Sequence, residues 1–178
     1  MSTCERGCKN GHIFRNGAWA RCECLTQTLY KRDLGVFATK FPKRDSALLG
    51  YQNESLVIEG PLTLIREHVA GVILALKDTD KTFTSMDSYR LVDIFLDKDE
   101  EFQGSAVLSD YDLYVLLLGF GEVKNQRLPD LIMQVPSRRG LLQKPTWVIL
   151  GLPLGQVPMK FSQEVYDTIA AYQKVKIR

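Results

Sequence analysis

Two uninterrupted apolar runs, Leu113–Leu118 (LYVLLL) and Thr146–Leu150 (TWVIL), constrain the fold of this chain more than any other feature. A strand with one solvated face alternates apolar and polar residues, whereas a continuous apolar run needs cover on both faces. Strands of this kind belong to parallel sheets, in which helical crossovers join one strand to the next. We therefore expect an α/β protein with a parallel sheet and flanking helices.

Helical patterns separate the predicted strands along the chain. The short apolar strand Leu56–Ile58 is followed by apolar residues at helical spacing from Leu62 to Leu76. We expect Leu113–Leu118 to be the central strand, with Leu56–Ile58 and Thr146–Leu150 as its neighbours. The remaining expected elements are a β-prone segment at Thr82–Ser85, helices over Asp87–Leu96, Gln126–Gly140 and from Ser162 to about Gln173, and a last strand at Lys174–Ile177.

A glycine-proline turn at Gly60 stands where a nucleotide-binding loop would begin. Residues 55–69 (SLVIEGPLTLIREHV) have the strand-turn-helix setting of the P-loop G-x-x-x-x-G-K-[ST], which bends N–H groups around phosphate. Aligned on Gly60, the second glycine, the lysine and the hydroxyl of that motif become Ile65, Arg66 and Glu67. A β-branched residue resists the tight curl, a carboxylate repels phosphate, and one guanidinium cannot rebuild the nest of donors. We expect the loop to be absorbed into a turn or into the helix start, and ATP not to bind.

Size and charge indicate one globular domain with a small basic appendage. The chain has 178 residues, 45% of them hydrophobic, and no apolar run near the roughly 20 residues that cross a bilayer. Its first residues lack the apolar core of a signal peptide, so we expect a cytoplasmic protein. Residues 1–45 carry a net charge of +5 and residues 46–178 a net charge of −3. We expect a zinc knuckle over 1–30, a basic linker over 31–54 and a P-loop-like core over 55–178.

All four cysteines lie near the amino terminus, in the pattern C-x3-C-x13-C-x-C formed by Cys4, Cys8, Cys22 and Cys24. Two close pairs joined by a hairpin can supply four thiolates to one tetrahedral zinc ion. The dipeptides Asn10-Gly11 and Asn16-Gly17 flank a β-prone stretch, as a hairpin requires. We expect structural Zn²⁺, with a disulfide or free thiols as alternatives. His12 could replace one cysteine, although a solvent-facing histidine fits better because four thiolates already close the site.

Basic and aromatic residues surround the cysteines, which is the composition of a nucleic-acid stacking surface. The alternative is that Phe14 and Trp19 form the small core of this module while the charges are solvated. The residues that would contact nucleic acid are Arg6, Lys9, Arg15, Trp19, Arg21, Lys31 and Arg32. Further along, Lys40, Lys43 and Arg44 could contact phosphates or belong to a solvated linker.

Taken in order, these segments resemble the helicase-loader branch of AAA+ ATPases, the DnaC/IstB-type family. The resemblance rests on the knuckle CERGCKNGHIFRNGAWARCEC, the degenerate P-loop, LYVLLLGFGEVKN, and LPDLIMQVPSRRGLLQKPTWVILGLPL. It covers nearly the whole chain, although each fragment alone is weakly specific. It implies an AAA+-like core and a role in DNA replication.

The departures from this family fall on its catalytic positions. The family's Walker B strand ends in two aspartates that hold magnesium, whereas here Leu117 and Leu118 precede Gly119, and Glu122 lies beyond the strand end. The sensor strand runs into Gly151 instead of a polar pair. The helix SQEVYDTIAAYQ carries none of the arginines that face a neighbouring subunit's nucleotide. Because phosphoryl transfer depends on these charges, ATP hydrolysis is not expected.

The resemblance therefore implies an inactive helicase-loader-like protein, from a phage or other mobile element, that binds a replicative helicase or its loader. The alternative is a zinc protein that binds single-stranded nucleic acid nonspecifically. No membrane partner is expected. A residual enzyme is the weakest alternative. No second histidine or nucleophile is spaced to cooperate with His68. A cluster of acidic residues is more typical of an exposed loop than of a metal site: Asp97, Asp99, Glu100 and Glu101.

Overall fold

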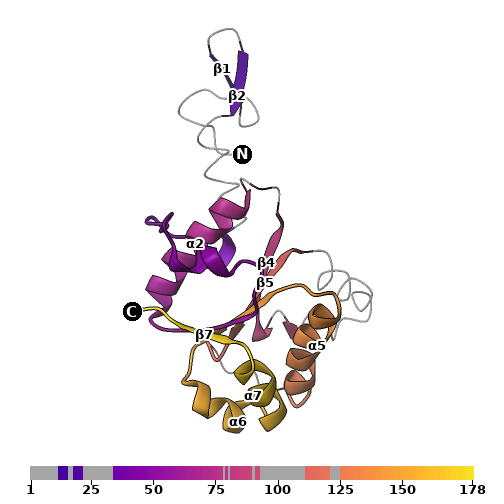
Figure 1. The fold of residues 1–178 in the computed structure, drawn as a ribbon. Helices are drawn as coiled ribbons and strands as arrows, with labels where there is room; N and C mark the ends of the chain where they lie inside the picture. The colour runs from indigo at the N-terminus through magenta and orange to yellow at the C-terminus, as the bar shows by residue number, and fades with distance from the viewer. Residues whose placement is uncertain are drawn as a thin grey trace. The chain divides into compact units, whose positions relative to one another are not determined.

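The computed structural model describes residues 12–15, 18–21, 34–77, 79, 81–89, 91–92, 111–120 and 125–178. The chain divides between Ala38 and Thr39 into two compact units. Residues 39–54, which the sequence assigns to a linker, are counted with the larger unit. Figure 1 shows the two units as a ribbon. In the part of the chain that is described, no helix is long and apolar enough to span a membrane.

The smaller unit contains an antiparallel hairpin of β1 (His12–Arg15) and β2 (Ala18–Arg21). Arg15 pairs with Ala18, so two residues separate the strands, the shortest common hairpin connection. His12 pairs with Arg21 at the other end, so the chain enters and leaves the hairpin at the same end. The predicted hairpin is confirmed. A 3₁₀ helix, η1 (Gly35–Phe37), follows in this unit.

The larger unit is built on a five-stranded parallel sheet in the order β4-β5-β6-β3-β7. Every residue of β5 and β6 is buried, as the two apolar runs predict. The α/β fold class with a parallel sheet is therefore confirmed. The strands are β3 (Leu56–Glu59), β4 (Phe83–Asp87), β5 (Leu113–Leu118), β6 (Thr146–Leu150) and β7 (Gln173–Lys176).

The predicted strand order was partly wrong. β5 pairs with β6 as expected, but its other neighbour is β4 and not β3. β6 is the middle strand, because Val148 is paired with Leu116 on one side and with Val57 on the other. An apolar run reports burial on both faces, and β3, β5 and β6 all have it. Which of these three strands lies in the middle depends on how the helical crossovers connect them, and composition does not encode those connections.

The helices agree with the sequence periodicity except at their ends. Of the helix predicted over Asp87–Leu96, the described residues Ser88, Tyr89, Leu91 and Val92 are helical, but Asp87, its predicted start, is the last residue of β4. The last helix, α7, begins after Ser162, whose hydroxyl accepts a hydrogen bond from the Val165 amide at 3.1 Å. It ends at Ala170, earlier than expected, because the chain must join the sheet at Gln173. The elements outside the sheet are η2 (Ala47–Tyr51), α2 (Leu62–Lys77), α5 (Leu128–Leu141), η3 (Leu154–Gln156), α6 (Val157–Lys160) and α7 (Gln163–Ala170).

Helices cover the two faces of the sheet, with α2 on one side and α5, α6 and α7 on the other (Figure 1). On the α5 and α7 face, alternate strand residues such as Val57, Leu116 and Val148 pack against Ile132 and Ile169. Burial of both sheet faces provides the main stabilisation of this unit.

Arg139 ties the end of α5 to the beginnings of β5 and β6. Its side chain is fully buried. Nε donates to the Pro145 carbonyl and to Thr146 Oγ1, both at 3.2 Å, and Nη2 donates to Pro145 O at 2.8 Å. Nη1 and Nη2 also reach the carbonyls of Tyr111 and Asp112 at 3.0 and 3.2 Å. This arginine belongs to the segment LPDLIMQVPSRRGLLQKPTWVILGLPL that carries the family resemblance, and its role is structural.

Candidate nucleotide-binding edge

The carboxyl ends of β3, β5 and β6 meet at one edge of the sheet, where ligands of open α/β sheets bind. Each of these strands is followed by a glycine: Gly60, Gly119 and Gly151. This edge is where the sequence places the degenerate P-loop and the two altered strand ends. Its geometry decides whether a nucleotide fits.

The turn after β3 has no room for a phosphate-binding loop. α2 begins at Leu62, and the Ile65 amide already bonds to the Pro61 carbonyl at 3.0 Å. The expectation that the loop would be absorbed into a turn or into the helix start is confirmed, and the helix start is the outcome. Ile65 is fully buried in the core, so it cannot be released to form a loop without exposing apolar surface. Arg66 and Glu67 are helical and half-buried, and Arg66 Nε is buried without a hydrogen-bond partner.

The chain's own carboxyl-terminal segments fill the space beside Gly60. The Ile177 amide donates to the Glu59 carbonyl at 2.9 Å, continuing the β7 pairing. Gly60 has φ +148°, and a Cβ at this position would collide with the Ile177 carbonyl. The Glu59 carboxylate accepts a hydrogen bond from the Leu154 amide at 3.1 Å. The Glu59 carboxylate therefore lies at the end of β3, where a P-loop would begin. This negative charge would repel a phosphate.

The ends of β5 and β6 pack backbone against backbone. The Gly151 amide donates to the Leu118 carbonyl at 2.7 Å. A Cβ added to Gly151 would lie 2.7 Å from the Gly119 carbonyl oxygen, and one added to Gly119 would collide with the Leu152 side chain. The positions that would carry magnesium-binding and sensor side chains are thus held by glycines and leucines. Among the described residues, no three His, Cys, Asp or Glu side chains form a metal-binding group. Glu122 lies outside those residues.

A cavity of ≈ 330 Å³ opens at this edge, lined by Gly119, Leu152, Gln156, Met159 and Lys160. Met159 is 84% exposed, and the described lining combines apolar Leu152 and Met159 with polar Gln156 and Lys160. Lys160 is the one cation among these described residues. No described lining residue is acidic, so this cavity offers a magnesium ion no carboxylate.

His68 of α2 is a packed structural residue and not a catalytic one. It is 8% exposed, its Nδ1 lies 3.1 Å from Ser46 Oγ, and its Nε2 lies 3.4 Å from Lys43 Nζ. Because an ammonium group only donates, Nε2 is the acceptor and Nδ1 carries the proton. Burial, and then the Lys43 charge, hold the pKa of His68 below its usual value, against the opposing effects of Asp45 and Glu67. The ring is therefore neutral at pH 7.

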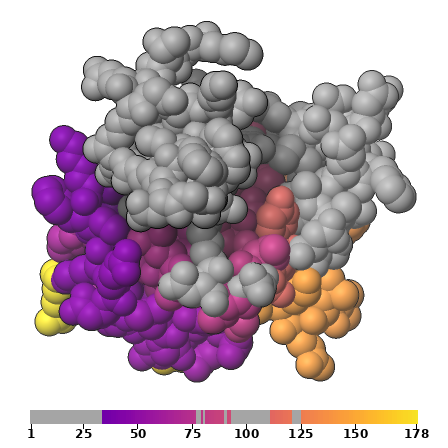
Figure 2. All heavy atoms as spheres, turned by 90° about the horizontal axis from the view of Figure 1, so that it is seen from above, coloured from indigo at the N-terminus to yellow at the C-terminus, as the bar shows by residue number. Residues whose placement is uncertain are grey.

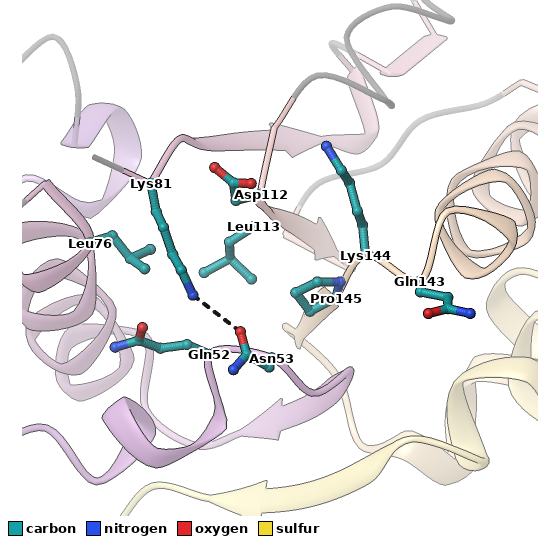
Figure 3. A pocket seen from close by; sticks show the side chains of 9 residues that line it. All are labelled: Gln52, Asn53, Leu76, Lys81, Asp112, Leu113, Gln143, Lys144 and Pro145. Carbon is teal, nitrogen blue, oxygen red and sulfur yellow. Dashed lines mark hydrogen bonds between the residues drawn. The ribbon is translucent and has the colours of Figure 1, made fainter. Parts of the chain in front are cut away.

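A second cavity, of ≈ 180 Å³, lies at the opposite edge of the sheet, where β5 and β6 begin (Figure 3). Lys81 Nζ donates to Asn53 Oδ1 at 3.2 Å, and Asp112 Oδ2 accepts from the Thr82 amide at 2.7 Å. The Thr82 hydrogen bonds hold the pKa of Asp112 below its usual value. Figure 3 shows the ammonium groups of Lys81 and Lys144 pointing away from each other. They do not converge on one anion, so these contacts join loops and do not form a ligand site.

The zinc-knuckle candidates are only partly placed. Arg15, Trp19 and Arg21 lie in the hairpin strands, with Trp19 paired to Phe14 and Arg21 to His12. The side chains of these hairpin residues are not described. Lys40, Lys43 and Arg44 are exposed residues of the larger unit. The candidates outside the described residues are Cys4, Arg6, Cys8, Lys9, Cys22, Cys24, Lys31, Arg32, Asp97, Asp99, Glu100 and Glu101.

No profile of a known protein family matches the chain, and no curated protein matches it. Solved structures do match. A DnaC helicase loader superposes with a TM-score of 0.58 over 84% of this chain and 99% of its own, at 14% identity. DnaI superposes with a TM-score of 0.58 over 87% of this chain and 84% of its own, at 9% identity. AMPPCP-bound DnaA from Aquifex aeolicus gives a TM-score of 0.59 over 93% of this chain, at 12% identity.

At these identities the likeness establishes the fold, which is the AAA+ P-loop-like α/β fold expected from the resemblance. The chain spans 46% of a DNA replication initiation factor and 48% of the Aquifex DnaA chain. It thus corresponds to slightly less than half of these initiators, but to nearly all of the DnaC structure.

Proposed function

We propose that this protein acts in DNA replication as a catalytically inactive counterpart of a helicase loader, in the cytoplasm. Its partner would be a replicative helicase or an active loader, and its source a phage or other mobile element. The observation that carries the proposal is the sheet edge. The AAA+-like sheet and its flanking helices are present, but Glu59, Gly119, Gly151 and the chain at Ile177 pack closely at the edge where a nucleotide would be expected.

A fold that keeps its sheet and outer helices keeps the surfaces through which such subunits dock. Met159, which is 84% exposed beside the cavity at this edge, is an apolar side chain that a docked partner would cover. Because we propose that this edge binds no γ-phosphate, complex formation should not depend on ATP.

The test is co-purification and light scattering of the full chain with the helicases and loaders encoded beside it. We expect a complex of defined stoichiometry that is equally stable with ATP, with AMPPCP and without nucleotide. A complex that forms only with ATP would contradict the inactive role. No association with any helicase or loader of its genome would overturn the proposal.

The second candidate is nonspecific binding of single-stranded nucleic acid by the amino-terminal unit. The hairpin supports it, since Arg15, Trp19 and Arg21 lie on its two short strands. Binding would weaken steeply between low and moderate salt. An affinity for oligonucleotides that does not change over that range would contradict this candidate.

A further inference from the structure

We propose that the segment Thr39–Asp45 of the larger unit is a binding platform for single-stranded nucleic acid. In this platform Phe41 stacks on a base while Lys40, Lys43 and Arg44 contact phosphates. The proposal requires neither a helicase partner nor a zinc knuckle, because the platform belongs to the larger unit alone.

Phe41 is unusually exposed for an aromatic side chain. It is 74% exposed, more than Tyr89 at 52% or Phe120 at 40%, the other aromatic residues exposed in the described chain. Its backbone is nevertheless restricted, because Pro42 follows it and its amide bonds to Thr39 Oγ1 at 3.3 Å. The ring is therefore held in solvent by a constrained backbone, and a stacked base would cover apolar surface that the fold leaves open.

The platform is fixed to α2. The Lys43 amide donates to the Glu67 carbonyl at 2.9 Å, and Ser46 Oγ lies 3.1 Å from His68 Nδ1. Gly71 lets the Lys43 carbonyl approach the helix so closely that a Cβ at position 71 would collide with it. A flexible linker makes no such contacts. Because the segment is ordered before binding, little conformational entropy is lost when a strand docks.

The charges of the platform complete the chemistry of single-strand recognition. Lys40 precedes Phe41 in the chain, Lys43 and Arg44 follow it closely, and all three are exposed. Asp45 is the one acidic residue of the segment. Figure 2 shows the violet part of the chain, which includes this segment and its sequence neighbours, on the face turned to the viewer. A duplex keeps its base faces stacked, so this arrangement favours single strands.

The test uses the full chain, purified without chelators, and a fluorescently labelled oligothymidylate at low salt. We expect Phe41→Ala to weaken binding by about 5- to 100-fold, the usual effect of removing one stacking side chain. Leu141→Ala is the matched control, because Leu141 is also an exposed apolar residue, at 87%. It should bind within twofold of the native chain. Circular dichroism confirms that each variant is folded.

An abasic strand of the same length separates stacking from nonspecific loss. Native chain and Phe41→Ala should bind the abasic strand equally, because it offers no base. Phe41→Trp should restore binding to oligothymidylate and add fluorescence that is quenched on binding. Equal binding of the native chain and Phe41→Ala to oligothymidylate would overturn the platform. So would an equal loss of affinity of Phe41→Ala for oligothymidylate and for the abasic strand.

The phosphate contacts are tested through salt dependence. Arg44→Ala should lower the slope of log K against log salt by about 0.7, the value for one phosphate contact on a single strand. Arg138→Ala, another exposed arginine of the larger unit, should leave the slope unchanged. An unchanged slope for Arg44→Ala would remove Arg44 from the platform. Helicase association of Phe41→Ala, measured in parallel, should equal that of the native chain.

Discussion

At the scale of single residues, Arg139 carries a charge that is fully buried in the fold. Four acceptors surround its guanidinium: the carbonyls of Tyr111, Asp112 and Pro145, and Thr146 Oγ1. The ring of Tyr114 lies 5.5 Å from its Cζ, within range of a cation–π contact. Burial lowers the pKa of Arg139 to about 10, so the group stays protonated at pH 7.

Removing this side chain would leave several buried acceptors without a donor. We expect Arg139→Ala to lower the free energy of unfolding by about 3–5 kcal/mol, as breaking a buried charged network does. Arg138→Ala removes the same charge from an exposed neighbouring position. It should change the free energy of unfolding by less than about 0.5 kcal/mol. Urea denaturation measures both values. Equal small effects would show that the Arg139 network contributes little.

His68 makes stability depend on pH. Its pKa is lowered in the folded protein, so between pH 6.5 and the lower folded value the unfolded chain binds more protons. Stability is therefore present above pH 6.5 and is lost as the pH falls through the folded pKa. Protonated Nε2 would also face the Lys43 ammonium at 3.4 Å.

His68→Gln should flatten this acid-side loss, because the amide oxygen can still accept from Lys43 but does not titrate near neutral pH. Denaturant midpoints at pH 5 and pH 7.5 give the comparison. The native chain should lose more stability at pH 5 than the variant does. The same loss in both would assign the pH dependence to other groups.

At the scale of elements, two helical glycines should respond in opposite directions to the same substitution. Gly71 of α2 lies against the Lys43 carbonyl, whereas a Cβ at Gly140 of α5 would meet nothing within 4 Å. Helix propensity favours alanine over glycine by about 1 kcal/mol. We expect Gly140→Ala to stabilise the protein by up to that amount. Gly71→Ala should destabilise it, because the Cβ would push residues 39–46 off the helix.

Thermal unfolding of the two variants measures this difference directly. The melting temperature should rise for Gly140→Ala and fall for Gly71→Ala. A rise for both would mean that the contact between Lys43 and α2 yields at little cost, and it would weaken the case for a fixed platform.

The existence of most elements could be predicted from the sequence, but their neighbours could not. The apolar runs of β5 and β6 report burial, and the spacing from Leu62 to Leu76 reports a helix. Strand order depends on long-range pairing, which no local pattern contains, and so β3 was placed beside the wrong strand. The loss of the P-loop could be predicted from Ile65. The part played by Glu59 could not, because its partner, the Leu154 amide, lies far along the chain.

At the scale of the whole molecule, the amino-terminal unit is too small to be stabilised by a core alone. We propose that one zinc ion per chain stabilises it through Cys4, Cys8, Cys22 and Cys24. The hairpin supports this, because its chain enters and leaves at the same end, with one cysteine pair before it and one after it. The thiolates would be closed to water, so the metal would be structural.

Metal analysis of protein purified without chelators should give about one zinc per chain. Cys22→Ser should release the metal and increase proteolysis within residues 1–30. His12→Ala is the control and should keep the metal, because four thiolates suffice. If His12→Ala loses zinc, the histidine would be a zinc ligand in place of one of the four cysteines. A metal-free chain with a protease-resistant amino terminus would refute the site.

The last prediction concerns the larger unit as a whole: it should neither bind ATP with useful affinity nor hydrolyse it. Three obstacles coincide at one edge. The loop is part of α2, a carboxylate ends β3, and the Gly119–Gly151 contact leaves no room for a magnesium ligand. Restoring one residue should therefore rescue nothing. Ile65→Gly should only destabilise the fold, because Ile65 is fully buried.

Calorimetry with ATP and magnesium, and phosphate release in the presence of single-stranded DNA, are the measurements. A loader with an intact P-loop serves as the positive control. We expect no binding heat at micromolar concentrations and no turnover above buffer, for the native chain and for Glu67→Ser alike. Micromolar binding, or turnover that disappears in Arg66→Ala, would show that this edge opens to admit a nucleotide. The inactive role would then have to be abandoned, because Arg66 would be acting as the P-loop cation in spite of the altered loop.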